Sequence, residues 1–514
     1  MWWWLACTSG ETRVAPTDTE DVDDTAAIGA TGDTGPTDVG ALAVTVLDGP
    51  IHTQRSLRVE LPVDAGVAGR CVSVDDPAEV LFAESAAPAH EHELRFGGLL
   101  PDTTYECRVV LPEHPEIATT TVPLVVGERP AVLPEALVST DPALGMTGAF
   151  TLGSWYDEGC QGDTRQAWLI LWDPEGRIRW WKQLPEKVGV DVEALYHPDI
   201  DAIVWGGGGS VSGVITIEPL WDTSPSYAGE QHPDPDHSLF HHDATRLPDG
   251  TLLTLEADPI SLGGDTWIGF RVRRHDPISG ELLLDLRSQT VLDDGQLTPW
   301  HGGNPDAYHA NAISWRSTAD GPRLFLSLCA ERAILVIDGT DGELLMRVDD
   351  TWEVHDADGS VLPAHQFPQC QHGIELLDDH TLLVYDNGRN RKETRAERLR
   401  LDEVQQTITR EWWWSDGRFE GNGGDIDPLT EDRVLTTFSH MECLGSPPGL
   451  NEVVEVDVPT GRIASRLTLP ESDDILYRSQ RYDGCELFGG TRYCGAAMAR
   501  ADALAALFDR EAVP

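Results

Sequence analysis

Hydrophobic and polar residues alternate with a period of two along much of this chain, a pattern that predicts β-strands. Between residues 41 and 126 the alternation forms six short runs separated by Gly, Pro and Asp: ALAVTVLDG, SLRVELPV, GRCVSVDD, HELRFGGL, TYECRVVL and TTTVPLVV. Short alternating runs rich in β-branched residues are typical of antiparallel sheets with one buried face. We therefore expect a small β-sandwich over residues 41–126.

Two sequence phrases alternate from about residue 131 onward. One is a turn followed by a strand, as in LPDGTLLTLE and LLDDHTLLVYD. The other is an Asp, a Gly-bearing turn and a second strand, as in WDPEGRIRWW, HDPISGELLLDL and VDVPTGRIASRL. Paired, the phrases give about six units of roughly 50–65 residues, each with enough strand for a four-stranded blade. The sequence therefore predicts an all-β protein with a six-bladed β-propeller over residues 131–500.

Helical periodicity is confined to the C-terminus, in the segment ARADALAALFDREA. This segment predicts a closing helix over residues 501–514. No internal run approaches the roughly 20 apolar residues that a membrane-spanning helix needs. We therefore expect no transmembrane segment.

The composition restricts the partners of this chain. It has 514 residues, of which 87 are acidic and 37 basic, so its formal net charge is −50. A field of that sign repels nucleic acid and anionic lipid headgroups. The hydrophobic content of 40% is that of a globular protein with a sizeable core. We expect small-molecule partners and no nucleic-acid partner.

The N-terminal residues 1–7, MWWWLAC, resemble the end of a bacterial lipoprotein export signal, because Leu5-Ala6 precedes Cys7. The apolar stretch is shorter than the core of a complete signal and contains no Lys or Arg. Residues 8–40 are mostly Thr, Asp and Gly, a composition typical of a disordered acidic tether. These features predict an exported periplasmic or cell-surface lipoprotein that is attached to the membrane only through a lipid on Cys7.

Eight further cysteines form an even set, as expected for disulfides in an exported protein. They are Cys71, Cys107, Cys160, Cys329, Cys370, Cys443, Cys485 and Cys494. Cys71 and Cys107 both fall in the predicted sandwich, and Cys485 and Cys494 bracket one short stretch, so these are the two pairs we expect. The pairing of the others stays open. No CxxC motif is present, which argues against a structural zinc site.

The segment GLLPDTTYECRVV, with Leu100, Pro101 and Tyr105, resembles the fibronectin type III family. In that family a leucine, a proline and a tyrosine mark the corner that enters a late strand. The resemblance implies that the Tyr105 hydroxyl forms a hydrogen bond back to the main chain. Residues 41–126 contain no catalytic constellation, so we expect this unit to be a spacer or a docking domain.

Three histidines occupy equivalent places in the repeat: His242 in FHHDATRLPDG, His309 in DAYHANAISW and His372 in QCQHGIELLDDH. A repeat architecture gathers such positions around one axis. The alternation of a strand allows only one of His241 and His242 to face the channel, while His309 and Asn311, two residues apart, point to the same side. We expect one pocket in which these rings act as nucleophile, base, metal ligand or core residues.

A set of motifs spanning residues 130–500 resembles the bacterial arylsulfotransferase family. The motifs are HHD before LPDG, His-x-Asn, Gln-His before a strand ending in YDNGRNR, and YRSQR at 477–481. Members combine a β-sandwich with a six-bladed propeller. The resemblance implies sulfuryl transfer from an aryl sulfate ester to a phenol through a sulfohistidine, with neither a nucleotide donor nor a metal or other cofactor.

The resemblance also assigns roles to residues of this chain. His372 would be the nucleophile, and the residues that hold the sulfuryl oxygens and assist the leaving phenolate would be His242, His309 and Asn311. The residues expected to bind substrate are His241, Arg332, Gln371 and Asn387. We expect these eight residues to converge on one pocket.

Two positions depart from the family pattern. The family carries a sulfate-clamping arginine in a Ser-x-Arg phrase, where this chain has Cys329, and it tends to follow Gln-His with Asp, where this chain has Gly373. Because guanidinium offers an oxyanion two parallel donors, Cys329→Arg is predicted to raise turnover. Two alternatives stay open: a non-catalytic module that binds ligands or partners, and a zinc or copper site built from the three histidines.

Overall fold

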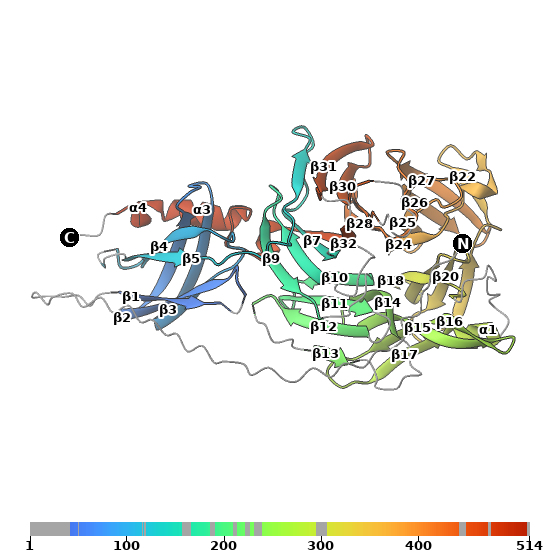
Figure 1. Cartoon of the computed structure of the whole chain (residues 1–514), viewed down its shortest axis with the longest axis horizontal. Helices are drawn as coiled ribbons and strands as arrows, with labels where there is room; N and C mark the ends of the chain where they lie inside the picture. Colours follow the sequence, from blue (N-terminus) through green and yellow to red (C-terminus); the bar gives the residue numbers. More distant parts are fainter. Residues whose placement is uncertain are drawn as a thin grey trace, which may run out of the picture. The chain divides into compact units, whose positions relative to one another are not determined.

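The computed structural model describes residues 42–49, 51–115, 117, 120–156, 166–185, 191–208, 213–221, 227–230, 239–293, 306–440, 449–470 and 474–510. The expectations for Cys7, the tether 8–40, Cys160 and Cys443 lie outside these residues. Strands dominate the described part of the chain and its helices are short, which confirms the all-β prediction (Figure 1). None of these helices has the length and apolar character needed to cross a membrane.

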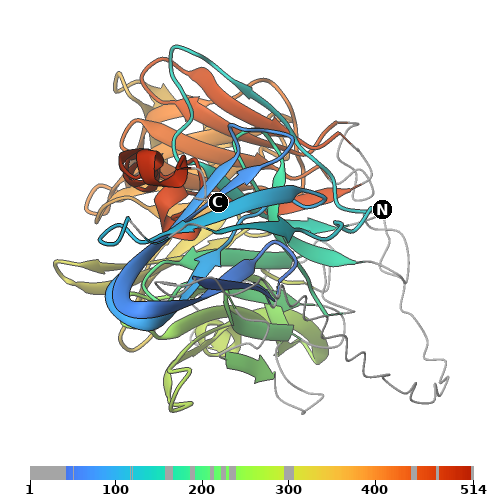
Figure 2. The same ribbon diagram turned by 90° about the vertical axis from the view of Figure 1, so that its left-hand side faces the viewer.

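The first sheet contains β1 (Ala43–Asp48), β2 (Arg55–Ser73), β3 (Val80–Phe96), β4 (Thr104–Val110) and β5 (Thr120–Val125). The first part of β2 pairs with β1 and its last part with β4, while β3 pairs with β2 along most of its length. Two runs predicted as separate strands, SLRVELPV and GRCVSVDD, therefore form one long strand. The strands of this sheet bend sharply and enclose an apolar core (Figure 2).

Two sequence predictions are confirmed in the first sheet. Cys71 and Cys107 occupy directly opposite positions on β2 and β4 and are joined by a disulfide. The Tyr105 hydroxyl accepts a hydrogen bond from the backbone N–H of Leu100 at 3.0 Å. Both contacts tie β4 to neighbouring segments inside the core of this sheet.

Among the described residues, six further sheets follow, each built on four antiparallel strands. The strands of the first three are β10 (Asp191–His197), β11 (Ala202–Gly208), β12 (Gly213–Pro219), β13 (Tyr227–Glu230), β14 (Leu239–Arg246), β15 (Leu252–Leu262), β16 (Asp265–His275), β17 (Leu282–Arg287), β18 (Ala310–Thr318), β19 (Gly321–Leu328), β20 (Ala333–Asp338) and β21 (Leu344–Val348). The strands of the next two are β24 (Gln371–Leu376), β25 (Thr381–Asp386), β26 (Arg395–Asp402), β27 (Thr407–Trp414), β28 (Asp425–Thr430), β29 (Arg433–Phe438), β30 (Glu452–Asp457) and β31 (Arg462–Thr468). The last sheet comprises β32 (Ile475–Tyr482), β7 (Phe150–Tyr156), β8 (Ala167–Trp172) and β9 (Ile178–Gln183).

Short elements extend two of these sheets. β22 (Glu353–Asp356) and β23 (Val361–Leu362) add to the fourth sheet, and β6 (Leu137–Thr140) adds to the fifth. A short helix, α1 (Ser288–Asp293), follows β17, and a 3-10 turn, η1 (Ala364–Gln366), precedes β24. These additions lie at the outer strands or in connections, so the four-stranded pattern is kept.

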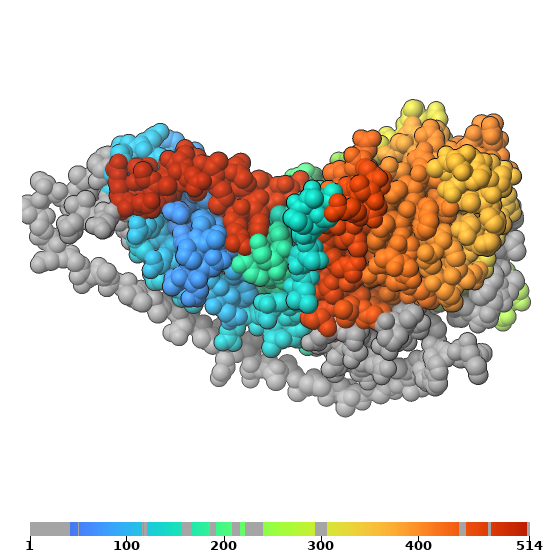
Figure 3. All heavy atoms as spheres, turned by 90° about the horizontal axis from the view of Figure 1, so that it is seen from above, coloured from blue at the N-terminus to red at the C-terminus, as the bar shows by residue number. Residues whose placement is uncertain are grey.

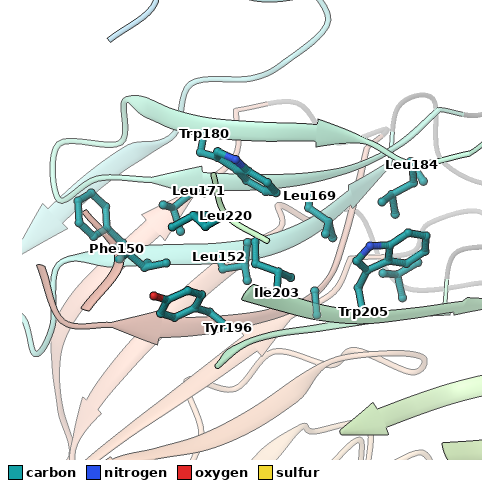
Figure 4. Close-up of a cluster of buried hydrophobic side chains, with 14 of the residues drawn as sticks. Phe150, Leu152, Leu169, Leu171, Trp180, Leu184, Tyr196, Ile203, Trp205 and Leu220 are labelled. Carbon is teal, nitrogen blue, oxygen red and sulfur yellow. The ribbon is translucent and has the colours of Figure 1, made fainter. Parts of the chain in front are cut away.

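The inner strands of the six sheets contact one another in a closed cycle. Contacts run from β10 to β14, β18, β24, β28, β32 and back to β10. The cycle closes in the sheet that joins β32, from the end of the chain, to β7–β9, from near its start. Neighbouring sheets bury apolar faces against each other, as Phe150, Trp180 and Trp205 do between the β7–β9 and β10–β11 strands (Figure 4). Side chains at the starts of inner strands are thereby brought together.

The C-terminal segment packs against the first sheet (Figure 3). It contains α2 (Gly484–Leu487), α3 (Gly495–Ala503) and α4 (Ala505–Phe508), so the helix begins earlier than the sequence predicts and is interrupted at Leu504. The apolar residues of this contact are Ala68, Phe82, Val110, Ala501, Leu504 and Phe508. Cys485 and Cys494 are joined by a disulfide, as predicted.

Candidate functional site

An irregularity interrupts the start of three inner strands. The pairing of β14 with β15 shifts register between Phe240 and Ala244, and that of β24 with β25 shifts between Gln371 and Gly373. A similar shift occurs at the start of β18. A β-bulge re-aims side chains and ends the regular alternation of a strand. The shifts therefore decide where the histidines of these strands point.

Four histidine rings come together where these inner strands begin. The ring centroid of His242 lies 4.0 Å from that of His241 and 5.1 Å from that of His309. The centroid of His372 lies 6.1 Å from those of both His242 and His309. The expectation that only one of His241 and His242 faces the channel fails, because His242 lies in the bulge with a φ of 69°. Both rings join the cluster.

His372 is 2% exposed, and Asn387 fixes the orientation of its ring. Nδ1 of His372 lies 2.6 Å from Oδ1 of Asn387. The amide nitrogen of Asn387 donates to the carbonyl oxygens of Glu420 and Gly423, at 2.8 and 2.9 Å. Because that nitrogen is a donor, Oδ1 accepts, and the imidazole proton resides on Nδ1. Nε2 then carries the lone pair, and it forms no hydrogen bond with the described residues.

His309 and His241 are also held through Nδ1. Nδ1 of His309 lies 2.6 Å from a carboxylate oxygen of Asp306, and Nδ1 of His241 lies 2.9 Å from the carbonyl oxygen of Ala310. Burial alone would raise the pKa of Asp306, but the adjacent His309 outweighs it and lowers that pKa to about 2. Asp306 is therefore an anion that favours a proton on Nδ1 of His309.

Two partners of these rings were missed by sequence reasoning. Nδ1 of His242 lies 2.5 Å from the hydroxyl of Tyr477, on β32. Asp306 stands only three residues before His309, so the phrase DAYH carries a local signal for it. Tyr477 opens the phrase YRSQR, but its distance from His242 along the chain gives no signal without the fold.

Burial keeps two of the imidazoles neutral. It lowers the pKa of His242 well below its usual value, and the neighbouring rings of His241 and His309 lower it further. Burial also lowers the pKa of His372, assisted by His309 and by the positive charge of Arg389. A neutral imidazole has a lone pair available for attack or for binding a metal ion. At neutral pH both rings are in this form.

Arg478, on the inner strand β32, contacts four other inner strands. Its Nη2 donates to the backbone carbonyl oxygens of Asn311 and His372, at 2.8 and 3.1 Å. Its Nη1 lies 2.5 Å from a carboxylate oxygen of Glu193 and 3.3 Å from one of Asp243. Arg478 thus holds the backbone of the histidine strand directly. The sequence motif YRSQR contains this residue, but no role for it was predicted.

A cavity of about 160 Å³ lies beside Arg478. Its acidic lining residues are Glu193, Asp243, Glu375 and Asp425. Burial raises the pKa of Glu193 to about 8 and also raises those of Asp243, Glu375 and Asp425. A pocket lined by four carboxyl groups does not suit an anion. An anionic ligand would therefore bind on the histidine side.

Three of the remaining predicted residues have different surroundings. Asn311 is 0% exposed, and neither polar atom of its side chain has a partner among the described residues. Gln371 turns its amide nitrogen to the carbonyl oxygen of Ala333, at 2.8 Å, so it packs between sheets. Arg332 is exposed at the turn after Cys329, and its guanidinium forms no ion pair or hydrogen bond with the described part of the chain. Asn311 thus has two polar side-chain atoms without partners among the described residues, and Gln371 has one, its Oε1.

Cys329 is joined to Cys370 by a disulfide, which the sequence did not predict. The backbone N–H of Cys329 donates to the carbonyl oxygen of His309, and Cys370 lies two residues before His372. The cross-link therefore clamps the segments that carry two of the clustered histidines. The prediction that Cys329→Arg raises turnover assumed a free cysteine; because the substitution would break this clamp, we now expect it to lower turnover.

Gly373 is explained by its neighbour across the inner strands. A Cβ at this position would lie 2.9 Å from Oδ1 of Asp425 and 3.0 Å from the backbone nitrogen of Ile426. A side chain here would push β24 away from β28. The carboxyl group of Asp425 thus occupies space that an aspartate at position 373 would need.

One comparison with known proteins shows the family of this chain. The family model described as arylsulfotransferase (ASST) matches residues 159–478. A search of the curated proteins finds no match. Similar solved structures include the periplasmic gluconolactonase PpgL of Pseudomonas aeruginosa, with 15% identity, 81% of this chain and 97% of that chain covered, and a TM-score of 0.34. TolB from Acinetobacter baumannii shares 10% identity, with 73% and 78% covered and a TM-score of 0.35. Similarities this distant carry no conclusion about function.

Proposed function

The chain belongs to the arylsulfotransferase family, and on this premise we propose that it transfers a sulfuryl group from an aryl sulfate ester to a phenol through a sulfohistidine on His372. No nucleotide sulfate takes part in this reaction. The pocket of histidines would bind the donor and the acceptor in turn. Both partners are small molecules.

One observation carries the proposal, the fixed tautomer of His372. Oδ1 of Asn387 accepts a hydrogen bond from Nδ1–H of His372, and the amide nitrogen of Asn387 donates to two carbonyl oxygens. The lone pair of His372 is therefore on Nε2, the nitrogen that would attack. Asn387 was expected to bind substrate, and its contacts favour this positioning role instead. Because burial keeps the ring neutral, no proton has to leave before the nitrogen can react.

The transfer divides into two balanced steps. Nε2 of His372 attacks the sulfur, an N–S bond forms, and the ester S–O bond breaks with its electron pair going to the leaving phenolate. The leaving phenolate takes a proton from His309, and the acceptor phenol returns a proton to His309 as its oxygen attacks the same sulfur. The N–S bond then breaks, and its electron pair returns to Nε2. We expect His242, His309 and the amide of Asn311 to hold the sulfuryl oxygens and to assist departure of the phenolate. Arg389 and Arg478, whose charges act on His372, favour an anionic donor.

The surroundings of the site support three further proposals. The closed cycle of six inner strands supports a six-bladed β-propeller, and the Tyr105 contact supports a fibronectin type III-like first domain. The sequence before residue 41 supports a lipid anchor on Cys7 after export. Cys7→Ser should release the protein from membranes, whereas equal partitioning of both forms would contradict the anchor.

A chromogenic aryl sulfate with a phenol acceptor tests the activity. The parent protein should release the coloured phenol and form the new aryl sulfate in equal amounts, with ping-pong kinetics. His372→Ala should abolish both products, and His309→Ala should slow turnover by about 10²–10⁴-fold through lost acid-base assistance. His380→Ala, at an exposed histidine, is the matched control and should leave both rates unchanged. Turnover that survives His372→Ala would contradict the proposal.

A further inference from the structure

We propose that His241, His242 and His309 form a binding site for a divalent zinc ion, with the fourth coordination position open toward His372. Sequence reasoning kept a zinc or copper site open only as an alternative, and the three histidines it considered were His242, His309 and His372. The bulge on β14 brings the imidazole of His241 into place. The site is argued from geometry that holds whether or not the proposed sulfuryl transfer is correct.

The spacing of the three residues fits one ion. One ring nitrogen from each of His241, His242 and His309 lies within 4.8 Å of the other two. Nitrogen ligands about 2.0–2.1 Å from a tetrahedral zinc ion lie roughly 3.3 Å from one another. The rings therefore have to close by no more than about 1.5 Å. Three imidazoles with an open fourth position are the donor set of a zinc ion that meets a ligand.

The partners of the three rings provide an independent argument. Metal-binding histidines commonly donate the N–H of the other ring nitrogen to a carboxylate, a carbonyl or another oxygen, which fixes the tautomer and the ring direction. Here Nδ1 of His309 faces Asp306, and Nδ1 of His241 faces the carbonyl oxygen of Ala310. We infer that Nε2 is the nitrogen that these rings turn to the ion.

His242 completes the set in the same way. Its Nδ1 faces the hydroxyl of Tyr477, at 2.5 Å. The ring centroid of His242 lies 4.0 Å from that of His241 and 5.1 Å from that of His309, so the three rings lie side by side. The carboxylate of Asp306, 2.6 Å from Nδ1 of His309, adds negative charge that favours a cation at this place. The distances between the ring nitrogens, the hydrogen-bond partners of the Nδ1 atoms and the nearby negative charge thus all favour a cation site.

A zinc ion at this site would replace the arginine that this chain lacks. Where the family carries a sulfate-clamping arginine, this chain has a cysteine that is used in the disulfide to Cys370. A zinc ion beside His372 would supply positive charge for a sulfuryl or leaving-group oxygen. This role rests on the proposed function. With the ion bound, His242 and His309 would act through the metal rather than as proton donors.

Cobalt and zinc titrations of the full-length protein test the site. After removal of metals with a chelator, the protein should take up one equivalent of Co²⁺ with the visible absorption of a four-coordinate site, and Zn²⁺ should displace it. His241→Ala should lose this binding. His372→Ala and the exposed control His380→Ala should keep it. Absence of binding in the parent protein, or binding that survives His241→Ala, would overturn the proposal.

A second variant, Asp306→Asn, tests the site even if His241→Ala fails to fold. It keeps the shape of the side chain but weakens the acceptor for His309, so zinc affinity should fall by about 10–100-fold. Unchanged affinity would contradict the ligand set. Metal binding without aryl sulfate turnover would uphold the site and reject the proposed function. Turnover by a protein that binds no metal would uphold the proposed function and reject the metal site.

Discussion

Two buried arginines of this protein have opposite surroundings. Arg179, on β9, is 0% exposed and donates to both oxygens of Glu79, to Asp173 and to the carbonyl oxygen of Gly98. Arg478, on β32, is 5% exposed in its side chain, and its Nε has no partner among the described residues. The first arginine joins β9 to the first sheet, and the second lies at the histidine cluster.

The difference teaches how to separate a structural polar cluster from a functional one. Around Arg179 the guanidinium is bonded along its whole edge, as a buried charge requires for stability. Near Arg478 the side chains of Asn311 and Asp427 keep buried polar atoms without partners among the described residues. Unmet polar groups destabilise a fold unless a ligand or water satisfies them. The unpartnered polar atoms beside Arg478 therefore fit a site that takes up a ligand.

Arg478→Met should have the largest effect on this comparison. It removes the donor to the backbone of His372 and leaves Glu193 and Asp243 without their cation. We expect kcat to fall by about 10²-fold because the nucleophile is misplaced, and the free energy of unfolding to fall by about 3–5 kcal/mol. Aryl sulfate turnover and urea unfolding measure the two effects. A stability loss with unchanged kcat would make Arg478 structural only.

Arg179→Met should lower stability without lowering kcat, in contrast to Arg478→Met. It leaves Glu79 and Asp173 buried without a partner, so the free energy of unfolding should fall by about 3–5 kcal/mol. Because Arg179 touches none of the histidines, kcat measured on the folded protein should stay at the parent value. Urea unfolding and turnover at low temperature check this pair of outcomes. A large fall in kcat would contradict the assignment of Arg179 to a purely structural cluster.

Cys329→Ser asks how far the site depends on its cross-link. The disulfide to Cys370 closes a loop of 41 residues, so its loss should lower the free energy of unfolding by about 2–4 kcal/mol. Turnover should fall as well, since the bond clamps the segments of His309 and His372. Cys485→Ser, at the disulfide near the C-terminus, is the control and should leave kcat unchanged. Equal kcat in both variants would limit the Cys329 bond to stability.

The pH dependence of stability should report the acidic cavity. Burial raises the pKa values of Glu193, to about 8, and of Asp425, so these groups hold protons that the unfolded chain has lost. Their contribution is present below the unfolded pKa and is lost as the pH rises through the folded value. The free energy of unfolding should therefore fall as the pH rises from about 4.5, the unfolded pKa of Glu193, to about 8, its folded pKa, by about 1.4 kcal/mol per pH unit for each proton.

Two variants sharpen the pH measurement. Asp425→Asn mimics the protonated carboxyl, so urea unfolding of this variant should show a flatter pH dependence. Asp350→Asn, at an exposed aspartate, should keep the slope of the parent protein. Parallel pH profiles of parent and Asp425→Asn would mean that the buried carboxyl groups do not titrate in this range.

Strand pattern and repeat were enough to predict much of the fold. The period-two runs identified the strands, and the paired phrases placed His242, His309 and His372 at matching points of successive sheets. The register shifts were not predictable, because a bulge depends on the partner strand rather than on local pattern. For that reason strand alternation placed only one of His241 and His242 in the channel, whereas both rings join the cluster.

The partners of the site depend on contacts between distant segments. Tyr477 reaches His242 only after β32 closes the cycle, and the Cys329–Cys370 bond joins two sheets that the sequence treats as separate units. Asp306, three residues before His309, was within reach of sequence reasoning. The sequence thus identified the histidines of the site, whereas most of the side chains that contact them could be found only in the structure.

Peptide mapping by mass spectrometry after brief exposure to an aryl sulfate, without acceptor, tests the central claim most directly. The account predicts one sulfuryl adduct, located on His372, that disappears when a phenol is added. Asn387→Ala, which frees the imidazole to change tautomer, should lower the yield of the adduct in the same exposure. An adduct on His241, His242 or His309, or no adduct in a protein that turns over, would contradict it.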